Sequence, residues 1–117
     1  MKIRLTNGTT VLTGTLLDNP TARDFVSLLP LTLKLTDYAE TEKISDLPRK
    51  LTTSAAPPDS TPAAGAIAYY APWGNLAIFY KPFARSHGLI QLGSIDTDIE
   101  LLARSGSLAV KVELINE

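Results

Sequence analysis

The chain has 117 residues, of which 44% are hydrophobic and 20% are charged, and its formal net charge is −1 at pH 7. These values are typical of one globular domain over residues 1–117, and they exclude a disordered chain and a basic surface for nucleic acid. The sequence contains no cysteine, which excludes disulfides and thiolate metal sites. No apolar run approaches the roughly 20 residues of a membrane span, and the N-terminus does not resemble a secretory signal. We therefore expect a cytoplasmic protein that binds neither nucleic acid nor a membrane.

Two strands joined by a tight turn are predicted at the N-terminus. Residues 2–6 alternate between apolar and polar side chains, which is the period of a half-buried strand. Asn7-Gly8 suits a type I′ turn, since both residue types tolerate a positive φ. Residues 9–17, rich in threonine, valine and leucine, form the predicted return strand.

A short helix and a further strand follow the hairpin. Asn19 can cap a helix whose first residue is Pro20, and Pro30 ends that helix. Apolar residues recur at helical spacing between these two prolines and predict one buried stripe. Leucines then alternate with polar residues over 31–36, which predicts a strand with one face in water.

The centre of the chain changes from polar connections to apolar strands. Residues 37–50 have no clear period and are predicted to form a polar connection, followed by a proline-rich surface loop over 52–65. Carboxylates in such a connection are expected to be solvated; they are Asp37, Glu40, Glu42 and Asp46. The continuous apolar runs 66–71 and 76–80 predict two strands packed on both faces, joined by a turn that contains Trp73.

The C-terminal part predicts a loop, two strands and a second helix. Residues 81–88 form the loop, and residues 89–95 form a strand. Residues 96–103 predict a short helix, with Thr97 and Glu100 spaced as a capping box. Residues 108–114 alternate as a final strand. The predicted fold is therefore mainly β: a closed, mostly antiparallel barrel with two short helices, because closure hides the strand edges.

The loop over 81–88 carries the candidate ligand site. Phe83, Arg85 and His87 occupy alternate positions, so in an extended segment their side chains share one side. They combine an aromatic ring, a permanent cation and an imidazole, a set that favours a small anionic or carboxylate ligand. Tyr70 and Trp73 are candidate aromatic walls of the same site. The alternatives are an exposed loop histidine and a tryptophan that caps one end of the barrel.

Motifs for the commoner chemistries are absent. No serine lies in a Gly-x-Ser-x-Gly elbow, and no glycine-rich phosphate loop is present. A single histidine without cysteine cannot form a histidine-rich metal site. We therefore predict no catalytic residue, no metal and no cofactor.

Two segments carry a resemblance to a known family. Residues 65–80, Gly-Ala-Ile-Ala-Tyr-Tyr-Ala-Pro-Trp-Gly-Asn-Leu-Ala-Ile-Phe-Tyr, and residues 88–95, Gly-Leu-Ile-Gln-Leu-Gly-Ser-Ile, resemble the cyclophilin-like family of small bacterial and archaeal proteins. The resemblance implies an eight-stranded barrel with a helix closing each end. The more distant resemblance to true cyclophilins implies prolyl isomerisation by an arginine and a glutamine on barrel strands. The matching strands carry Lys34 and Leu76-Ala77 instead, so no catalytic residue is carried over.

Three functions are compatible with these observations. The first is a non-catalytic module that binds a small anionic molecule or a peptide, as a monomer or a homodimer. The second, implied by the resemblance, is a weak prolyl isomerase or an accessory protein related to the cyclophilin-like domains of allophanate-hydrolase and oxoprolinase assemblies. The third is a structural subunit without a ligand. A deep pocket lined by the candidate residues would favour the first, and a flat apolar patch the third.

Overall fold

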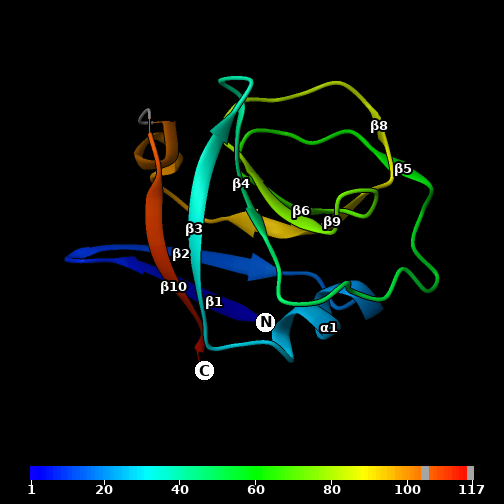
Figure 1. The fold of residues 1–117 in the computed structure, drawn as a ribbon, viewed down its shortest axis with the longest axis horizontal. Helices are drawn as coiled ribbons and strands as arrows, with labels where there is room; N and C mark the ends of the chain where they lie inside the picture. The colour runs from blue at the N-terminus through cyan, green and yellow to red at the C-terminus, as the bar shows by residue number, and fades with distance from the viewer. Residues whose placement is uncertain (104–105, 116–117) are drawn as a thin grey trace.

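Eight antiparallel strands form a closed barrel in the computed structural model, which describes residues 1–103 and 106–115 (Figure 1). Around the barrel the order is β1-β10-β3-β4-β7-β6-β9-β2. The strands are β1 (Lys2–Asn7), β2 (Thr10–Leu16), β3 (Leu31–Tyr38), β4 (Glu42–Asp46), β6 (Ala66–Tyr70), β7 (Asn75–Phe79), β9 (Leu89–Ile95) and β10 (Leu108–Ile115). The short strands β5 (Asp59–Ser60) and β8 (Ser86–His87) pair with each other outside the barrel. The predicted closed, eight-stranded, mainly β architecture is confirmed.

The predicted N-terminal hairpin is present, with its turn one residue further along. Asn7 is already paired with Thr10, so Gly8 and Thr9 are the two turn residues. Gly8 has a φ of +59°, whereas Asn7 remains in the strand. A positive φ at only the first central residue is typical of a type II′ turn, so the prediction of a type I′ turn on Asn7-Gly8 is wrong.

The predicted connection over residues 37–50 contains a barrel strand, which corrects the sequence interpretation. β4 pairs with β3 on one side and with β7 on the other. β3 and β4 are joined at Ala39 and Glu40, whose φ angles are 55° and 52°. This is the φ pattern of a type I′ turn. It was missed because neither residue is the glycine, asparagine or aspartate that usually marks such a turn.

The two predicted helical segments lie on opposite sides of the barrel (Figure 1). α1 (Pro20–Val26) is an α-helix, and the Asn19 side chain accepts a hydrogen bond of 2.8 Å from the amide of Ala22, as the capping prediction requires. α1 ends at Val26, before the predicted stop at Pro30.

The second segment is a 3₁₀ helix, η1 (Ile99–Ala103), so only one of the two predicted helices is an α-helix. Asp98, directly before η1, has a φ of 61°. This positive φ is not helical and lies between Thr97 and Glu100, the two residues of the predicted capping box. The helix therefore begins only after Asp98. The five residues of η1 make a short 3₁₀ turn, the length at which this helix type is common.

One apolar cluster fills the barrel, and a smaller one lies on its outer surface. Alternate residues of each strand point inward, so adjacent Tyr69 and Tyr70 belong to different clusters. The Tyr69 hydroxyl is buried and accepts a hydrogen bond from the Leu51 amide at 3.1 Å. The buried members of the outer cluster are Ala66, Ala68, Ala77, Phe79 and Leu89. Strands β6 and β7 are thus packed on both faces, as their continuous apolar runs predict.

Barrel closure brings the backbones of β2 and β9 unusually close at Gly93. A Cβ atom at this position would lie 2.2 Å from the Thr15 carbonyl oxygen and 2.8 Å from the Leu16 Cα. β9 changes its pairing near this residue, because a β-bulge interrupts its register with β6 between Ile67 and Ala68. Glycine is therefore required here by close backbone approach rather than by φ.

Candidate functional site

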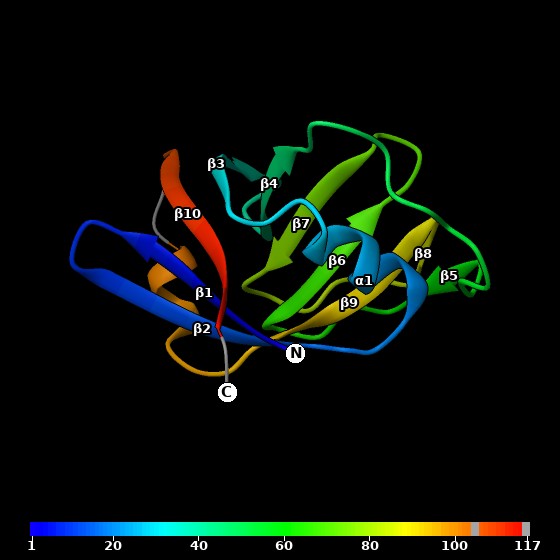
Figure 2. The ribbon, with the colours of Figure 1, turned by 90° about the horizontal axis from the view of Figure 1, so that it is seen from below.

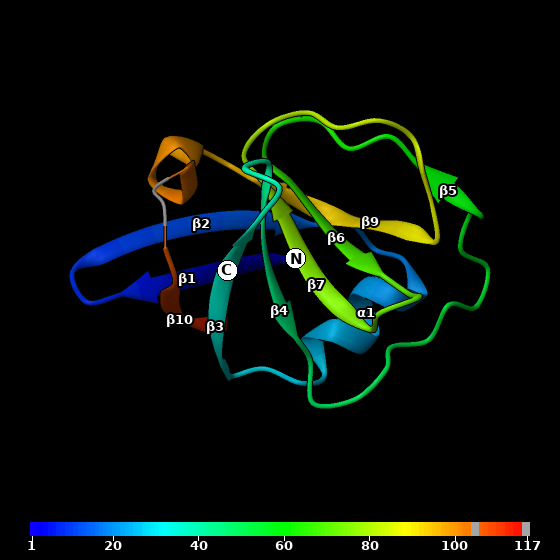
Figure 3. The same cartoon turned by 45° about the horizontal axis from the view of Figure 1, so that its top comes forward.

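Two long loops cover part of the outer face of the barrel. Residues 52–65 and 81–88, here called the paired loops, run side by side to β5 and β8 (Figures 1 and 3). The Gly88 amide donates to the Pro58 carbonyl at 2.8 Å, and the Phe83 amide donates to the Pro62 carbonyl at 3.1 Å. Each loop therefore supports the other, and together they present side chains beside the outer cluster.

A cavity of about 370 Å³, here called the outer groove, lies between this loop region and the β3–β4 turn. Its volume is within the range of small-molecule sites, which is roughly 300–1,000 Å³. The residues that line it are Tyr38, Ala39, Glu42, Tyr70, Trp73, Phe79, Phe83, Ser86, His87 and Leu89. They come from β3, β4, β6, β7, β8 and β9 and from the turns between them, so the groove exists only in the folded barrel.

Four of the five predicted site residues line this groove, and Arg85 does not. The four are Tyr70, Trp73, Phe83 and His87. The Arg85 side chain is 72% exposed, and its Nε lies 3.0 Å from a carboxylate oxygen of Asp59. That ion pair holds Arg85 against the neighbouring loop. The argument for an anionic ligand depended on this guanidinium, which the fold directs elsewhere.

The groove walls are mainly aromatic. The ring of Trp73 lies 5.5 Å from that of Tyr38 and 5.3 Å from that of Tyr70, with interplanar angles of 81° and 84°. Phe79 and Phe83 stack with their centroids 6.3 Å apart. Trp73 is 55% exposed and lines the outer groove. Large exposed rings held in place by other rings form a preorganised surface for a ligand.

Glu42 is the carboxylate of the groove, and burial changes its acidity. It lies in β4 with Tyr38 as its cross-strand neighbour in β3 and Phe79 as its neighbour in β7. Desolvation at this position raises the pKa of Glu42 from 4.5 to about 7. The expectation that the carboxylates of residues 37–46 are all solvated is therefore wrong for Glu42, and also for Asp37, which is half-buried beside Lys43. It holds for Glu40 and Asp46, which are exposed.

We expect the raised pKa of Glu42 to appear in the pH dependence of stability. Between about pH 4.5 and 7 the folded chain retains a proton on Glu42 that the unfolded chain has lost. The free energy of unfolding therefore falls as the pH rises through this window. Glu42→Gln removes that fall. The free energy of unfolding of the variant, relative to that of the wild type, should therefore rise by about 1–2 kcal/mol between pH 4 and pH 8. This is less than the full pKa shift corresponds to, because Glu42 is partly exposed.

Urea unfolding at several pH values, followed by circular dichroism, measures this difference. Glu40→Gln is the matched control, because Glu40 is an exposed carboxylate two residues away. Its difference from the wild type should stay nearly constant from pH 4 to pH 8. Equal pH profiles for the wild type and Glu42→Gln would contradict the assignment.

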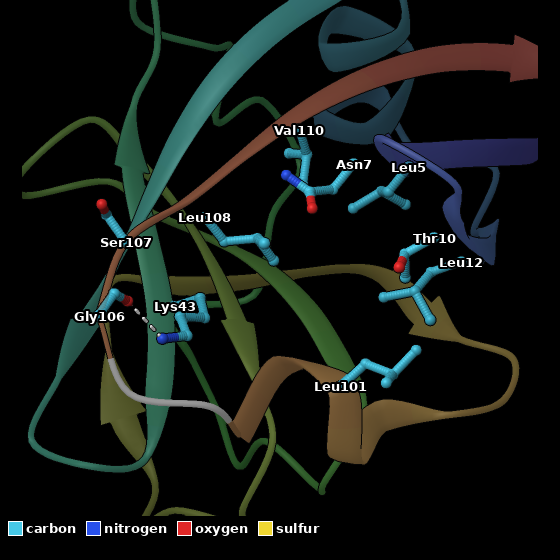
Figure 4. A pocket seen from close by; sticks show the side chains of 10 residues that line it. All are labelled: Leu5, Asn7, Thr10, Leu12, Lys43, Leu101, Gly106, Ser107, Leu108 and Val110. Atoms are coloured by element: carbon cyan, nitrogen blue, oxygen red, sulfur yellow. Dashed lines mark hydrogen bonds between the residues drawn. The ribbon is translucent and has the colours of Figure 1, made fainter.

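A second polar cluster lies inside the barrel, at the end covered by η1. The Lys43 side chain is 1% exposed, and its ammonium donates to the Gly106 carbonyl at 2.8 Å (Figure 4). It also lies 3.5 Å from a carboxylate oxygen of Asp37. The Tyr80 hydroxyl donates a hydrogen bond to the same carboxylate. Burial first, and then this hydrogen bond, raise the pKa of Tyr80 to about 12.

This cluster borders a cavity of about 150 Å³, and sequence reasoning did not find it. The other residues that line the cavity, which are drawn in Figure 4, are mainly apolar; among them are Leu5, Leu12, Leu101, Leu108 and Val110. The signal for Lys43 was its place in β4, where it alternates with the outward-facing Glu42 and Ile44. With residues 37–50 interpreted as a connection, that alternation could not be used.

Within residues 1–103 and 106–115, no group of three or more histidine, cysteine, aspartate or glutamate side chains is placed to hold a metal ion. Over the same residues, no helix is both long enough and apolar enough to cross a membrane.

Comparison with known sequences decides the family. A sequence profile of the Cyclophilin-like family matches residues 5–113. The chain belongs to the Cyclophilin-like family. No curated protein matches this Cyclophilin-like chain. The expected family resemblance is thus confirmed over nearly the whole barrel.

A solved structure supports the same fold. This Cyclophilin-like barrel is similar to the solution structure of a hypothetical protein from Archaeoglobus fulgidus, with a TM-score of 0.67 and 19% sequence identity. The match covers 97% of this chain and 93% of the archaeal chain. At this identity the likeness concerns the fold, so function has to be argued from the site.

Proposed function

We propose that this Cyclophilin-like protein is a non-catalytic binding module that holds a small molecule or a short peptide in the outer groove. The observation that supports the proposal is the convergence of four predicted residues, from three separate turns and strands, on one cavity of about 370 Å³. Aromatic walls with a few polar groups are typical of small-molecule sites. The paired loops contribute Phe83 and His87, so binding and loop position are coupled.

Prolyl isomerisation is not supported by the charges around the groove. Stabilising a twisted amide requires a positioned donor at the reacting centre. Among the described residues, no arginine lines the groove. Arg85 pairs with Asp59, and Arg49 donates hydrogen bonds to Asp24 at 2.7 Å and to Ser27 at 2.8 Å. The hydrogen bond from Arg49 also lowers the pKa of Asp24.

We therefore expect no efficient prolyl isomerase activity. In a protease-coupled assay on a proline peptide, the protein should give less than about one-tenth of the rate of an equal concentration of cyclophilin, because the groove lacks a placed cationic donor. A rate similar to that of cyclophilin would contradict the prediction. A loss of such a rate in Arg49→Ala or Arg85→Ala would then identify the donor.

Tryptophan fluorescence offers a direct test of binding. Trp73 is the single tryptophan of the chain and lies in the groove, so its emission reports on a ligand there. A fragment library of cations, anions and neutral compounds should yield compounds that change this emission and shift the backbone amide resonances of β6 and β8. Phe83→Ala should weaken their binding, and Arg85→Ala, outside the groove, should not. A library without any such compound would overturn the proposed function.

A further inference from the structure

The charged side chain of the groove is a carboxylate, whereas the loop sequence that suggested a site contains the cation Arg85. Among the described lining residues, Glu42 is the single carboxylate, and neither lysine nor arginine is present. We propose that the outer groove selects a small organic cation of the alkylammonium class, held between its aromatic rings and the Glu42 carboxylate. This inference rests on the proposed binding function and adds the chemical class of the ligand.

The aromatic walls are suited to a cation. Trp73 forms almost perpendicular ring pairs with Tyr38 and with Tyr70, and all three residues line the groove. A cation placed within about 6 Å of an aromatic face is attracted by the ring quadrupole, most strongly by tryptophan. Sites for quaternary ammonium groups combine several such rings because the cation can contact them at once. The negative faces of the same rings would repel an anion.

The position of Glu42 supplies the counter-charge. Its cross-strand partners are Tyr38 and Phe79, both of which line the groove. The carboxyl group is therefore placed among the rings and is partly withdrawn from water. A carboxylate in such a setting gains more from an approaching cation than an exposed one, since the interaction is less screened by solvent.

Binding of a cation should also depend on pH. Several titratable groups lie near Glu42: Tyr38 from β3, Tyr70 from β6 and His87 from β8 line the groove with it, and Tyr80 after β7 and Glu40 in the turn lie close by. The pKa of Glu42 is about 7, so its ionised fraction falls about tenfold between pH 8 and pH 6. A ligand that requires the carboxylate loses affinity by a similar factor. His87 also lines the groove, so the variant without Glu42 is needed to isolate the contribution of the carboxylate.

Choline chloride and its neutral carbon isostere, 3,3-dimethylbutan-1-ol, test the inference, with sodium propionate as an anion of similar size. Each is titrated at pH 8 while the Trp73 emission and the amide resonances are followed. Choline should bind about tenfold more tightly than the isostere, the factor expected from one cation–π contact and one partly buried carboxylate. The affinity for choline should fall severalfold at pH 6, and by less than tenfold because the contacts with the aromatic rings remain.

Glu42→Gln should lower the preference for choline over the isostere, because the carboxylate's share is lost while the aromatic rings remain, and it should remove most of the pH dependence of choline binding. Glu40→Gln, the matched control outside the groove lining, should behave like the wild type. The inference is overturned if the isostere or propionate binds as tightly as choline, or if Glu42→Gln binds choline like the wild type. In those cases a ligand still occupies the groove and the proposed function stands. A groove that binds none of the three probes overturns the cation inference, and the fragment library then decides the proposed function.

Discussion

Replacing Gly93 by alanine is expected to destabilise the barrel by about 3 kcal/mol or more, at or above the upper end of the usual range for overpacking. The added Cβ would lie 2.2 Å from the Thr15 carbonyl oxygen, so one backbone has to move. The obstacle is the main chain of β2, which cannot change rotamer. Any relief therefore separates β2 from β9 and weakens the closure of the barrel.

Gly14→Ala is the matched control, because Gly14 belongs to the same pair of strands. Its Cβ would meet the flexible tip of Ile67 at 3.1 Å and the Ser94 carbonyl oxygen at 3.2 Å. These contacts are tight but can be relieved by small shifts, so we expect a loss of about 1 kcal/mol. Urea unfolding at pH 7, followed by circular dichroism, measures both. Losses of equal size would show that the approach of β2 to Gly93 is looser than described.

Phe25→Ala is expected to cost about 3–5 kcal/mol, the usual penalty for removing a buried phenylalanine side chain. Phe25 is 1% exposed and anchors α1 to the apolar interior of the barrel. α1 has seven residues, too few for a stable isolated helix, so packing has to hold it in place. Loss of this side chain both opens a cavity and releases the helix.

Phe83→Ala makes the same chemical change on the surface. Phe83 is 46% exposed and contacts Phe79 at the groove, so its removal should cost less than about 1 kcal/mol. The pair separates stability from binding: Phe25→Ala should lower the midpoint of urea unfolding strongly, and Phe83→Ala should mainly weaken ligands of the groove. A large loss of stability in Phe83→Ala would make it a structural residue of the paired loops.

The parts of the fold that the sequence predicted are those where local signals agree with the tertiary structure. Alternation over residues 31–36 and 108–114, and the two continuous runs after residue 65, all correspond to strands. The Asn19 cap was found because capping depends on a few neighbouring residues. The helix predicted over residues 96–103 was only partly right, since Asp98 has a positive φ and a 3₁₀ helix begins after it at Ile99.

β4 could not be predicted because its evidence is distributed over the fold. Its turn uses alanine and glutamate at positive φ, and its inward residue is a lysine. A buried lysine breaks the usual binary pattern, and it is tolerated because Asp37 and the Gly106 carbonyl lie beside its ammonium. Those partners lie 6 positions before it and 63 after it, so no local window contains both.

The candidate site was predicted in its aromatic part and missed in its charged part. Tyr70, Trp73, Phe83 and His87 meet in the groove, but Arg85, which alternation within residues 81–88 placed on the same side as Phe83 and His87, does not line it. Arg85 pairs with Asp59, a residue of the other loop, which single-sequence reasoning could not know. Glu42 was missed with β4.

The pairing of β1 with β10 has a consequence for how the chain folds. Lys2 lies opposite Ile115 and Thr6 opposite Lys111, so the first and last strands of the barrel are neighbours (Figure 2). Closure therefore requires contacts of very high sequence separation, and folding rates fall as the mean separation of contacts rises. During synthesis β1 has no partner on one side until β10 has left the ribosome. We expect slow closure, with an exposed strand edge on the nascent chain that a chaperone can shield.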